Sequence, residues 1–513
     1  MSDADALFER GAQARREGRN DLARALFLDA LAREPTHRNA ALALAFLFRE
    51  EGEGGKAAEA LRPLVRAPVS QPRELAAIAE FVAETGETDL ALEALGRART
   101  ESGETPAFLF AHGRLLFQTG RFDEAREAFV RTFARDPHHA GAYYQWVQTR
   151  RWTGREGDEA LEVLARAAAA APSPETLSAI SFARAKVADD LGRTDEAFAR
   201  LHEANALRKS ALPPFDHAFY EEWLETFLPG SGRLEGAPPA PAVTDAPRSG
   251  DGEPPPAPLF VVGLPRSGTT LLARLLLRRG DATLAGEPDL LGRLAEHLTG
   301  PGGRSRDLRR ALEALPSTER DRLAEAYLRG LRTRIGGRRP RWAIDKNPLN
   351  LWFLPLLRTL FPRAPVLWCR RDRRDVLLSL YFQNFAHPAL DFSYDLADLD
   401  RHLLLVARAE EAILAEADPY LLPLDYETFV RDPQAALRAA GRILGPAPHP
   451  NGEGEAVLGE ESRIATASTW QARQPPHTGS VGRWRRYARF LLAAHPALRG
   501  HGFTADLDDP PAA

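Results

Sequence analysis

A loop of polar residues bounded by glycines separates two apolar segments near the middle of the chain. The stretch PLFVVGLPRSGTTLLARLL covers residues 258 to 276, and its first part, 259–262, has the composition of a buried strand. Residues 271–277 have the apolar content of a following helix. A strand, a glycine-bounded loop and a helix N-terminus direct several backbone N–H groups and a positive dipole end toward one point. The pattern therefore predicts an anion site, and phosphate is the expected anion.

The spacing of Gly263 and Gly268 matches the start of the nucleotide-binding sequence G-x-x-x-x-G-K-[ST], but Thr269 occupies the lysine position. Without that lysine the loop is poorly equipped to bind β- and γ-phosphates. The sequence also offers no convincing aspartate at the end of a strand to hold magnesium. A kinase, ATPase or GTPase is therefore disfavoured.

A second strand, turn and helix are predicted in APVLWCRRDRRDVLLSLYF. Val366 to Cys369 is apolar, Arg371 follows it, and Ser379 lies eight residues further on the predicted helix. A guanidinium and a hydroxyl that converge on a phosphate dianion form charge-assisted hydrogen bonds. The alternative is that Arg371 is one more solvated arginine of the RRDRRD cluster.

Lysine is rare in this chain, with four lysines among 67 basic residues. Lys346 lies between Asp345 and Asn347, directly after an apolar, strand-like segment. A lysine ammonium is a compact donor that suits an oxygen on which negative charge develops during a reaction. An ion pair with Asp345 is the structural alternative.

The loop GLPRSGTTLL resembles the 5'-phosphosulfate loop of the sulfotransferase family. That family uses 3'-phosphoadenosine 5'-phosphosulfate (PAPS) on a P-loop-like α/β fold, and its 3'-phosphate motif has the spacing of Arg371 and Ser379. The resemblance implies sulfuryl transfer to an acceptor hydroxyl, release of adenosine 3',5'-bisphosphate (PAP), and no need for a metal. It implies that the donor-binding loop residues are Arg266, Ser267, Gly268, Thr269 and Thr270.

Three further segments resemble tyrosylprotein sulfotransferases. The segment around Lys346 is similar to their K-D-P sequence, with Asn347 in place of the aspartate, and implies that Lys346 lies in the active site. The G-E context of Glu287 implies a general base, for which a solvated position beside a helix N-cap is the alternative. The sequence S-T-x-Q-x-x-x-P begins at Ser468 and implies a sulfate or phosphate ligand there. On this resemblance, Arg266 completes the catalytic set.

The segment SVGRWRRY, residues 480–487, combines basic and aromatic side chains. Two interpretations stay open: these side chains cover the 3'-phosphate and adenine, or they pack a terminal amphipathic helix. The first interpretation adds three nucleotide-binding candidates, Ser480, Arg483 and Trp484. His387 and His477 are expected to have no catalytic role.

The first part of the chain repeats with a period of 34 residues. Ala23, Ala57, Ala91 and Ala125 are each 34 residues apart, and each follows a glycine by five positions. The pattern resembles the tetratricopeptide repeat, which implies a curved α-solenoid that presents a concave face to a peptide or protein. The alternative is that the solenoid only stabilises or dimerises the protein.

The expected organisation is therefore an α-solenoid of tetratricopeptide-type repeats over residues 1–228, a flexible Pro/Gly-rich linker over 229–257, and a P-loop-like α/β sulfotransferase domain with a central parallel sheet over 258–513. A net charge of -4 argues against nucleic-acid binding. The single cysteine and the lack of a signal peptide or a membrane span favour the cytoplasm.

The acceptor is less constrained than the donor. A peptide or protein tyrosine is favoured, because the Glu287 and Lys346 contexts resemble that branch and a repeat array can present a polypeptide. A carbohydrate or small-molecule hydroxyl is the rival acceptor. A hypothesis of another class is a scaffold that senses nucleotide without turnover.

Overall fold

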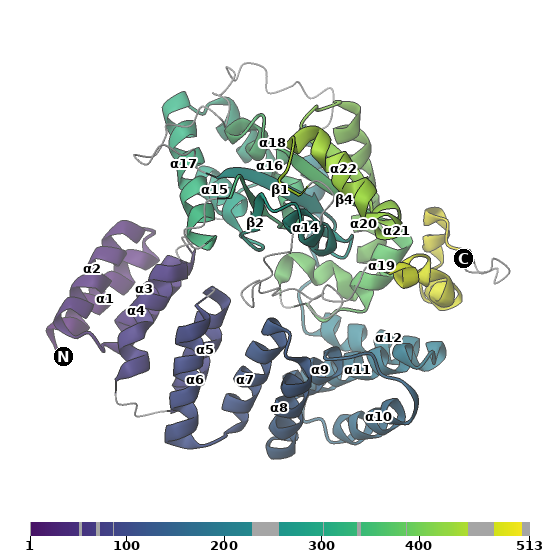
Figure 1. The fold of residues 1–513 in the computed structure, drawn as a ribbon, viewed down its shortest axis with the longest axis horizontal. Helices are drawn as coiled ribbons and strands as arrows, with labels where there is room; N and C mark the ends of the chain where they lie inside the picture. The colour runs from purple at the N-terminus through teal and green to yellow at the C-terminus, as the bar shows by residue number, and fades with distance from the viewer. Residues whose placement is uncertain are drawn as a thin grey trace. The chain divides into compact units, whose positions relative to one another are not determined.

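The structure is a computed structural model of the 513-residue chain (Figure 1). It describes residues 2–50, 54–67, 72–85, 87–227, 256–300, 302–335, 340–385, 387–449 and 477–504. The chain forms two compact units, one of residues 1–149 with 329–337 and one of residues 150–328 with 338–513. Every contact discussed for the functional site lies within the second unit.

The first unit is a series of helices in which consecutive members pack in pairs. The four alanines of the 34-residue repeat are fully buried in it. Gly113 shows how closely paired helices approach, because a Cβ there would lie 2.7 Å from a ring carbon of Phe129. The small residues of the repeat are thus packing positions, and the assignment to the tetratricopeptide family stays a prediction. The helices are α1 (Asp3–Arg16), α2 (Asn20–Arg33), α3 (Arg38–Glu50), α4 (Gly54–Arg66), α5 (Pro72–Thr85), α6 (Thr88–Ser102), α7 (Pro106–Thr119), α8 (Phe122–Arg135) and α9 (Ala140–Gln148).

Four more helices precede the sheet but belong to its compact unit. They are α10 (Gly154–Ala169), α11 (Pro174–Asp190), α12 (Thr194–Ser210) and α13 (Ala218–Phe227). The predicted linker falls largely on residues 228–255, which lie outside the described part of the chain. Ala257, predicted to end the linker, already belongs to the sheet, because its N–H donates to the Arg341 carbonyl over 2.9 Å.

A five-stranded parallel sheet organises the second unit and confirms the predicted central parallel sheet. Its order is β2-β3-β1-β4-β5, and all four pairings are parallel. Gly263 at the end of β1 lies beside Cys369 of β4, and Phe260 of β1 lies beside Asp345 at the end of β3. The ends of β3, β1 and β4 are therefore neighbours on one edge of the sheet. The strands are β1 (Ala257–Gly263), β2 (Ala282–Leu284), β3 (Trp342–Asp345), β4 (Val366–Arg370) and β5 (Leu421–Asp425).

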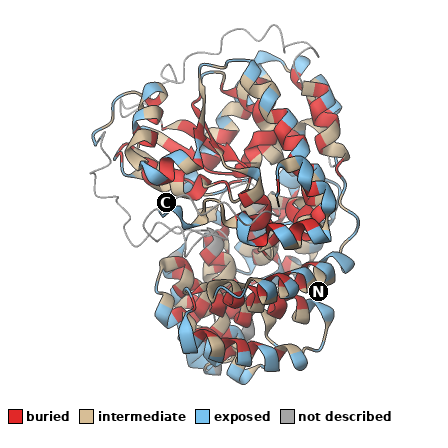
Figure 2. Ribbon diagram, turned by 90° about the vertical axis from the view of Figure 1, so that its right-hand side faces the viewer, coloured by how far each residue is buried: buried red, intermediate tan, exposed pale blue. Residues whose placement is uncertain are grey.

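Alternating residues of β1 serve two cores, as the period of a strand requires. Leu259 and Val261 pack with helices α14 (Thr269–Leu277) and α22 (Pro433–Leu444) on one face, and both helices lie beside the sheet in Figure 1. On the other face, Phe260 contacts Tyr327 of α17 (Ser317–Arg334) and Phe361 after α18 (Leu354–Leu360). The strands lie among the buried residues of Figure 2.

An aromatic seam joins α13 to the sheet domain, and we define it as Tyr220, Trp223, Trp352, Phe392 and His402. Tyr220 lies 4.7 Å from both Trp352 and His402, measured between ring centroids. Trp223 Nε1 donates to the Trp352 carbonyl over 2.8 Å. Helix α13 is thus packed into the core of the sheet domain. The seam's other residues come from η2 (Pro348–Phe353), η3 (Pro388–Tyr394) and α20 (Leu396–Ala415).

The remaining elements surround the sheet. They are α15 (Leu290–Thr299), α16 (Ser305–Glu313), α19 (Arg373–Tyr381), α21 (Tyr426–Arg431), η4 (Thr478–Ser480), η5 (Arg483–Tyr487), α24 (Ala488–Ala494) and η6 (Pro496–His501). Over the described residues, none of the helices has the length and apolarity needed to cross a membrane.

Candidate functional site

The loop between β1 and α14 is wound tightly by left-handed backbone. Gly263 has φ +147°, and a Cβ there would lie 2.4 Å from the Cys369 carbonyl oxygen. Gly268 has φ +104°, and its Cβ would lie 2.5 Å from the Tyr426 ring. Arg266 also has a positive φ, +70°, which is unusual for a residue with a side chain. Such strain persists where the fold requires it, and it is concentrated at functional sites.

Three hydroxyls of this loop are withdrawn from solvent. Ser267, Thr269 and Thr270 are all buried, and Ser267 is only 1% exposed. Ser267 Oγ has no hydrogen-bond partner among the described residues. A buried hydroxyl without a partner is unfavourable unless something else binds it. Ser267 lies at the N-terminal end of α14, where the helix dipole favours an anion, so its hydroxyl is placed to donate to one.

The structure brings together the two predicted anion motifs. Arg266 Nε donates to Ser379 Oγ over 3.0 Å, and Arg371 Nη1 donates to the Arg266 carbonyl over 2.9 Å. Arg371 Nη2 donates to the Ser480 carbonyl over 2.6 Å. The Arg371 guanidinium also lies over the Tyr426 ring, 4.5 Å from its centroid. Arg371 is therefore held by carbonyls and a ring rather than solvated, and its buried Nε has no partner in the described chain.

The end of β3 presents an ion pair beside these motifs. Lys346 is only 1% exposed, and its Nζ pairs with Glu287 Oε1. The Glu287 side chain is 39% exposed, so the pair reaches from the interior toward solvent. Its two segments run side by side because the Lys346 N–H donates to the Gly286 carbonyl over 3.0 Å. Two predicted catalytic residues from distant parts of the sequence thus form direct contacts.

Asp345, the alternative partner for Lys346, is engaged in the sheet core. Its Oδ2 accepts a hydrogen bond of 2.6 Å from the Tyr327 hydroxyl. Its Oδ1 accepts one of 3.2 Å from the Asn347 backbone N–H. The Asn347 amide in turn donates to the Pro288 carbonyl over 3.0 Å. Asp345 and Asn347 therefore fix the backbone on both sides of Lys346.

The C-terminal basic and aromatic segment lies against α19. Asp375 accepts from the backbone N–H groups of Gly482, over 2.6 Å, and Trp484, over 2.9 Å. Burial raises the pKa of the Asp375 carboxyl above its usual range. Trp484 is 3% exposed, and its ring centroid lies 4.1 Å from the guanidinium carbon of Arg374. Arg483 is directed to Asp189 of α11 instead, over 2.7 Å. Ser468 lies outside the described residues.

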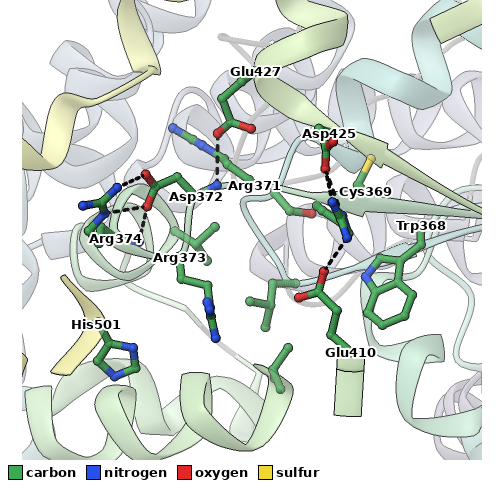
Figure 3. A pocket seen from close by; sticks show the side chains of 15 residues that line it. Trp368, Cys369, Arg371, Asp372, Arg373, Arg374, Glu410, Asp425, Glu427 and His501 are labelled. Carbon is green, nitrogen blue, oxygen red and sulfur yellow. Dashed lines mark hydrogen bonds and ion pairs between the residues drawn. The ribbon is translucent and has the colours of Figure 1, made fainter. Parts of the chain in front are cut away.

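A cavity of about 550 Å³ opens at the ends of β4 and β5 (Figure 3). Ser267 and Arg371 line it together with a cluster of carboxylates. Arg370 connects two of them, with contacts of 2.7 Å to Asp425 and 3.1 Å to Glu410. Glu427 accepts from the Asp372 N–H over 3.0 Å. Sequence reasoning missed Glu410, Asp425 and Glu427 because they lie on other elements than the arginines. It gave no role to Asp372, which lies within the arginine cluster.

The family comparison concerns the sheet domain, whereas one relative matches a longer part of the chain. Residues 258–449 match the model of the sulfotransferase family. An uncharacterized protein of Aquifex aeolicus (strain VF5) is 28% identical over 410 residues, which are 77% of this chain and 50% of that protein. The nodulation protein NoeE of Sinorhizobium fredii (strain NBRC 101917 / NGR234) is 33% identical over 139 residues, 26% of this chain and 33% of that protein.

A crystal structure of sulfotransferase STF1 from Mycobacterium tuberculosis H37Rv aligns with 62% of this chain and 92% of its own, at 15% identity and a TM-score of 0.25. The chain spans half the length, or less, of the two curated relatives. The family match supports sulfotransferase activity for the sheet domain. It does not extend to the helices before residue 258, so the repeat family and the acceptor stay predictions.

Proposed function

We propose that this chain, whose residues 258–449 match the sulfotransferase family, transfers a sulfuryl group from PAPS to an acceptor hydroxyl and releases PAP. One observation carries the proposal: the two predicted anion-binding motifs contact each other at the ends of β1 and β4, and the buried Ser267 hydroxyl has no partner in the described chain. A ligand with two separate phosphate groups matches two such motifs.

The donor's 5'-phosphosulfate is assigned to the loop after β1. Its N–H groups, the Arg266 guanidinium and the Ser267 hydroxyl supply hydrogen bonds there, and Thr269 and Thr270 lie in the first turn of α14. The dipole of that helix adds favourable electrostatics. These donors neutralise the transferred group, so the proposal needs no metal ion.

The 3'-phosphate is assigned to Arg371 and Ser379. Ser379 Oγ accepts from Arg266, so its own hydrogen remains available to donate to a phosphate oxygen. Arg371 contributes charge and its buried Nε. Because ATP has no 3'-phosphate, this second motif selects PAPS over ATP. Ser480 and Trp484 are proposed to complete the nucleotide side of the site.

The reaction is an in-line displacement at sulfur. The acceptor oxygen forms a bond to sulfur while the bond from sulfur to the bridging oxygen of the donor breaks. Lys346 donates to that bridging oxygen as it gains negative charge, and Ser468 is proposed to assist it. Glu287 accepts the acceptor's proton, which requires its pair with Lys346 to open as the two substrates enter.

The proposed acceptor is a tyrosine of a peptide or protein, which the helical repeats would present. Incubation with 35S-labelled PAPS and a cell lysate, followed by separation of protein from small molecules, tests this part. Label in the protein fraction is expected. Label confined to small molecules would assign a carbohydrate or small-molecule hydroxyl instead.

The cytoplasmic location also stays a prediction.

Turnover distinguishes an enzyme from a nucleotide-sensing scaffold. Glu287→Gln keeps the shape of the side chain but cannot take a proton, so kcat should fall by about 10²-fold or more while the Kd for PAP stays within about twofold. Single-turnover transfer from labelled PAPS measures the rate of the chemical step, and calorimetry measures the Kd for PAP. A scaffold would bind PAP without transferring label in either protein.

A further inference from the structure

Asp189, at the end of helix α11, contacts three side chains of the C-terminal segment, of which Arg486 is the most distant, with its Nη2 at 3.6 Å. Its carboxylate accepts from Arg483 Nη2 over 2.7 Å and from the Tyr487 hydroxyl over 2.6 Å. The Asp189 side chain is 15% exposed and that of Arg483 is 23% exposed, while Tyr487 is fully buried. Because the contact is charge-assisted and largely withdrawn from water, it constrains position more than a surface ion pair does.

The backbone beside these side chains is fixed from the opposite side by Asp375. That carboxylate accepts from the N–H groups of Gly482 and Trp484, the two neighbours of Arg483. Two carboxylates, one from α11 and one from α19, therefore hold the same three-residue segment. Helix α11 comes from the repeat-like part of the sequence, whereas α19 carries a predicted phosphate ligand, Ser379.

Ser480, two residues before Gly482 in the chain, is joined by hydrogen bonds to the loop after β1. The Ser480 carbonyl accepts from Arg371 over 2.6 Å. Arg371 donates to the Arg266 carbonyl over 2.9 Å, and Arg266 donates to Ser379 over 3.0 Å. A displacement of residues 480–484 would therefore move the guanidinium assigned to the 3'-phosphate.

The helical hairpin of α11 and α12 holds α19 at a second point. His202 Nδ1 lies 2.9 Å from the Tyr381 hydroxyl, and the Asn205 side chain donates to the Tyr381 carbonyl over 3.0 Å. Tyr381 ends α19, two residues after Ser379. The segment that holds Arg371 and the helix that carries Ser379 are therefore both held by α11 and α12, which precede the sheet.

Building on the proposed function, we propose that Asp189 is a positioning residue of the nucleotide site. It anchors Arg483 and Tyr487, which fixes the Ser480 carbonyl and, through it, the Arg371 guanidinium. Arg483 is then an anchor and not a ligand of the nucleotide, a choice that the sequence left open. Helices α11 and α12 therefore help to position the donor site and are not a module separable from it.

A double-mutant cycle tests whether Asp189 and Arg483 act as one unit. If Asp189 and Arg483 act as one unit, Asp189→Ala and Arg483→Ala should each weaken PAP binding about tenfold, and the double variant should weaken it by about the same factor. The loss should appear in KM for the donor rather than in kcat. Calorimetry with PAP and steady-state transfer measure these effects. Unchanged or tighter PAP binding by Asp189→Ala would overturn the proposal.

Asp195→Ala is the matched control on the same hairpin. Asp195 pairs with Arg489 over 2.6 Å, but its side chain is 76% exposed, and nothing links that pair to Arg371 in the described contacts. Its loss should leave the Kd for PAP unchanged. Tyr487→Phe supplies a milder variant, which keeps the buried ring and removes one of the two hydrogen bonds to Asp189.

Hydrogen–deuterium exchange tests the positioning without nucleotide. Asp189→Ala and Tyr487→Phe should increase amide exchange in residues 478–487 and in the loop 263–270, whereas Asp195→Ala should not. Unchanged exchange in both Asp189→Ala and Tyr487→Phe would overturn the positioning role. If the wild-type protein binds no PAP, the proposed function fails, and the exchange result still decides whether Asp189 positions these segments.

Discussion

The ends of β1 and β4 and the aromatic seam are built in opposite ways. At the strand ends φ is positive at Gly263, Arg266 and Gly268, and this strains the backbone of Arg266, which carries a Cβ. The Ser267 hydroxyl there is buried without a partner in the described chain. In the seam, rings pack on rings: Phe392 stacks on His402 with centroids 3.8 Å apart.

This difference separates the functional and the stabilising parts of the fold. Strained backbone and vacant donors destabilise the unliganded protein but are ready for a ligand. Aromatic packing contributes stability and offers no reactive group. Substitutions at the strand ends should therefore change binding or chemistry, and substitutions in the seam should change stability and its dependence on pH.

The largest effect is expected from Lys346→Ala. It removes the buried ammonium assigned to the leaving oxygen, so kcat should fall by about 10²- to 10³-fold. Lys209→Ala is the control, since Lys209 is also ion-paired, with Asp395, but its side chain is 51% exposed and it lies on α12. Steady-state transfer from labelled PAPS measures both. An equal kcat for the two variants would remove Lys346 from the mechanism.

Gly263→Ala tests how closely the loop after β1 approaches the backbone of β4. Its Cβ would lie 2.4 Å from a backbone oxygen, so the free energy of unfolding should fall by about 3 kcal/mol. Gly300→Ala is the comparison, because Gly300 has φ +81° with no described atom within 4 Å of its Cβ. That variant should lose about 1 to 2 kcal/mol, because φ +81° with ψ 169° is unfavourable for a residue with a side chain. Urea unfolding measures both, and equal losses would contradict the close-contact explanation.

In the seam, His402 should make stability depend on pH. Burial lowers the pKa of His402 to about 3, below the unfolded value near 6.5. As pH falls, the unfolded chain binds the proton first, so stability present above pH 6.5 is lost progressively toward pH 3. From pH 7.5 to pH 5 this loss amounts to about 2 kcal/mol.

His402→Gln should remove that part of the acid sensitivity, as measured by urea unfolding at the two pH values. His495→Gln should keep it, because the His495 side chain is 23% exposed and lies outside the seam. Equal pH dependence in the wild type and His402→Gln would show that His402 is not the group responsible.

The smallest effect is expected from Ser267→Ala. This variant separates an effect on ligand binding from an effect on stability. Because the hydroxyl has no partner in the described chain, its removal should not lower the free energy of unfolding, yet PAP affinity should fall about tenfold. Ser393→Ala is matched to it: Ser393 is fully buried, and no described group bonds its Oγ, but it lies on η3. Ser393→Ala should leave PAP affinity unchanged. Calorimetry measures the PAP affinity of both variants, and urea unfolding measures their free energy of unfolding.

The sequence carries enough local information to predict the strand ends. Gly263 and Gly268 interrupt an apolar pattern, so the loop and the helix there follow from period and composition. The pairing of Arg371 with Ser379 is predicted from its resemblance to the 3'-phosphate motif of sulfotransferases. The structure places both motifs on adjacent parallel strands. The pairing of Lys346 with Glu287 was not predictable from spacing, because it depends on β3 lying beside β2.

The features that the sequence does not predict depend on contacts between distant segments. Nothing near Arg483 in the sequence indicates that its partner is Asp189, which lies 294 positions away. The same holds for Trp223 and Trp352, 129 positions apart. A 34-residue period describes how a helix packs on its neighbour, but it does not show that α10 to α13 join the compact unit of the sheet.

Calorimetric titration of the full chain with PAP, and separately with ATP and magnesium, tests the central claim most directly. Two phosphate-binding motifs at the ends of β1 and β4 predict that PAP binds at least about tenfold more tightly than ATP, and that Ser379→Ala narrows the difference. No binding of PAP, or equal affinity for ATP, would contradict the account.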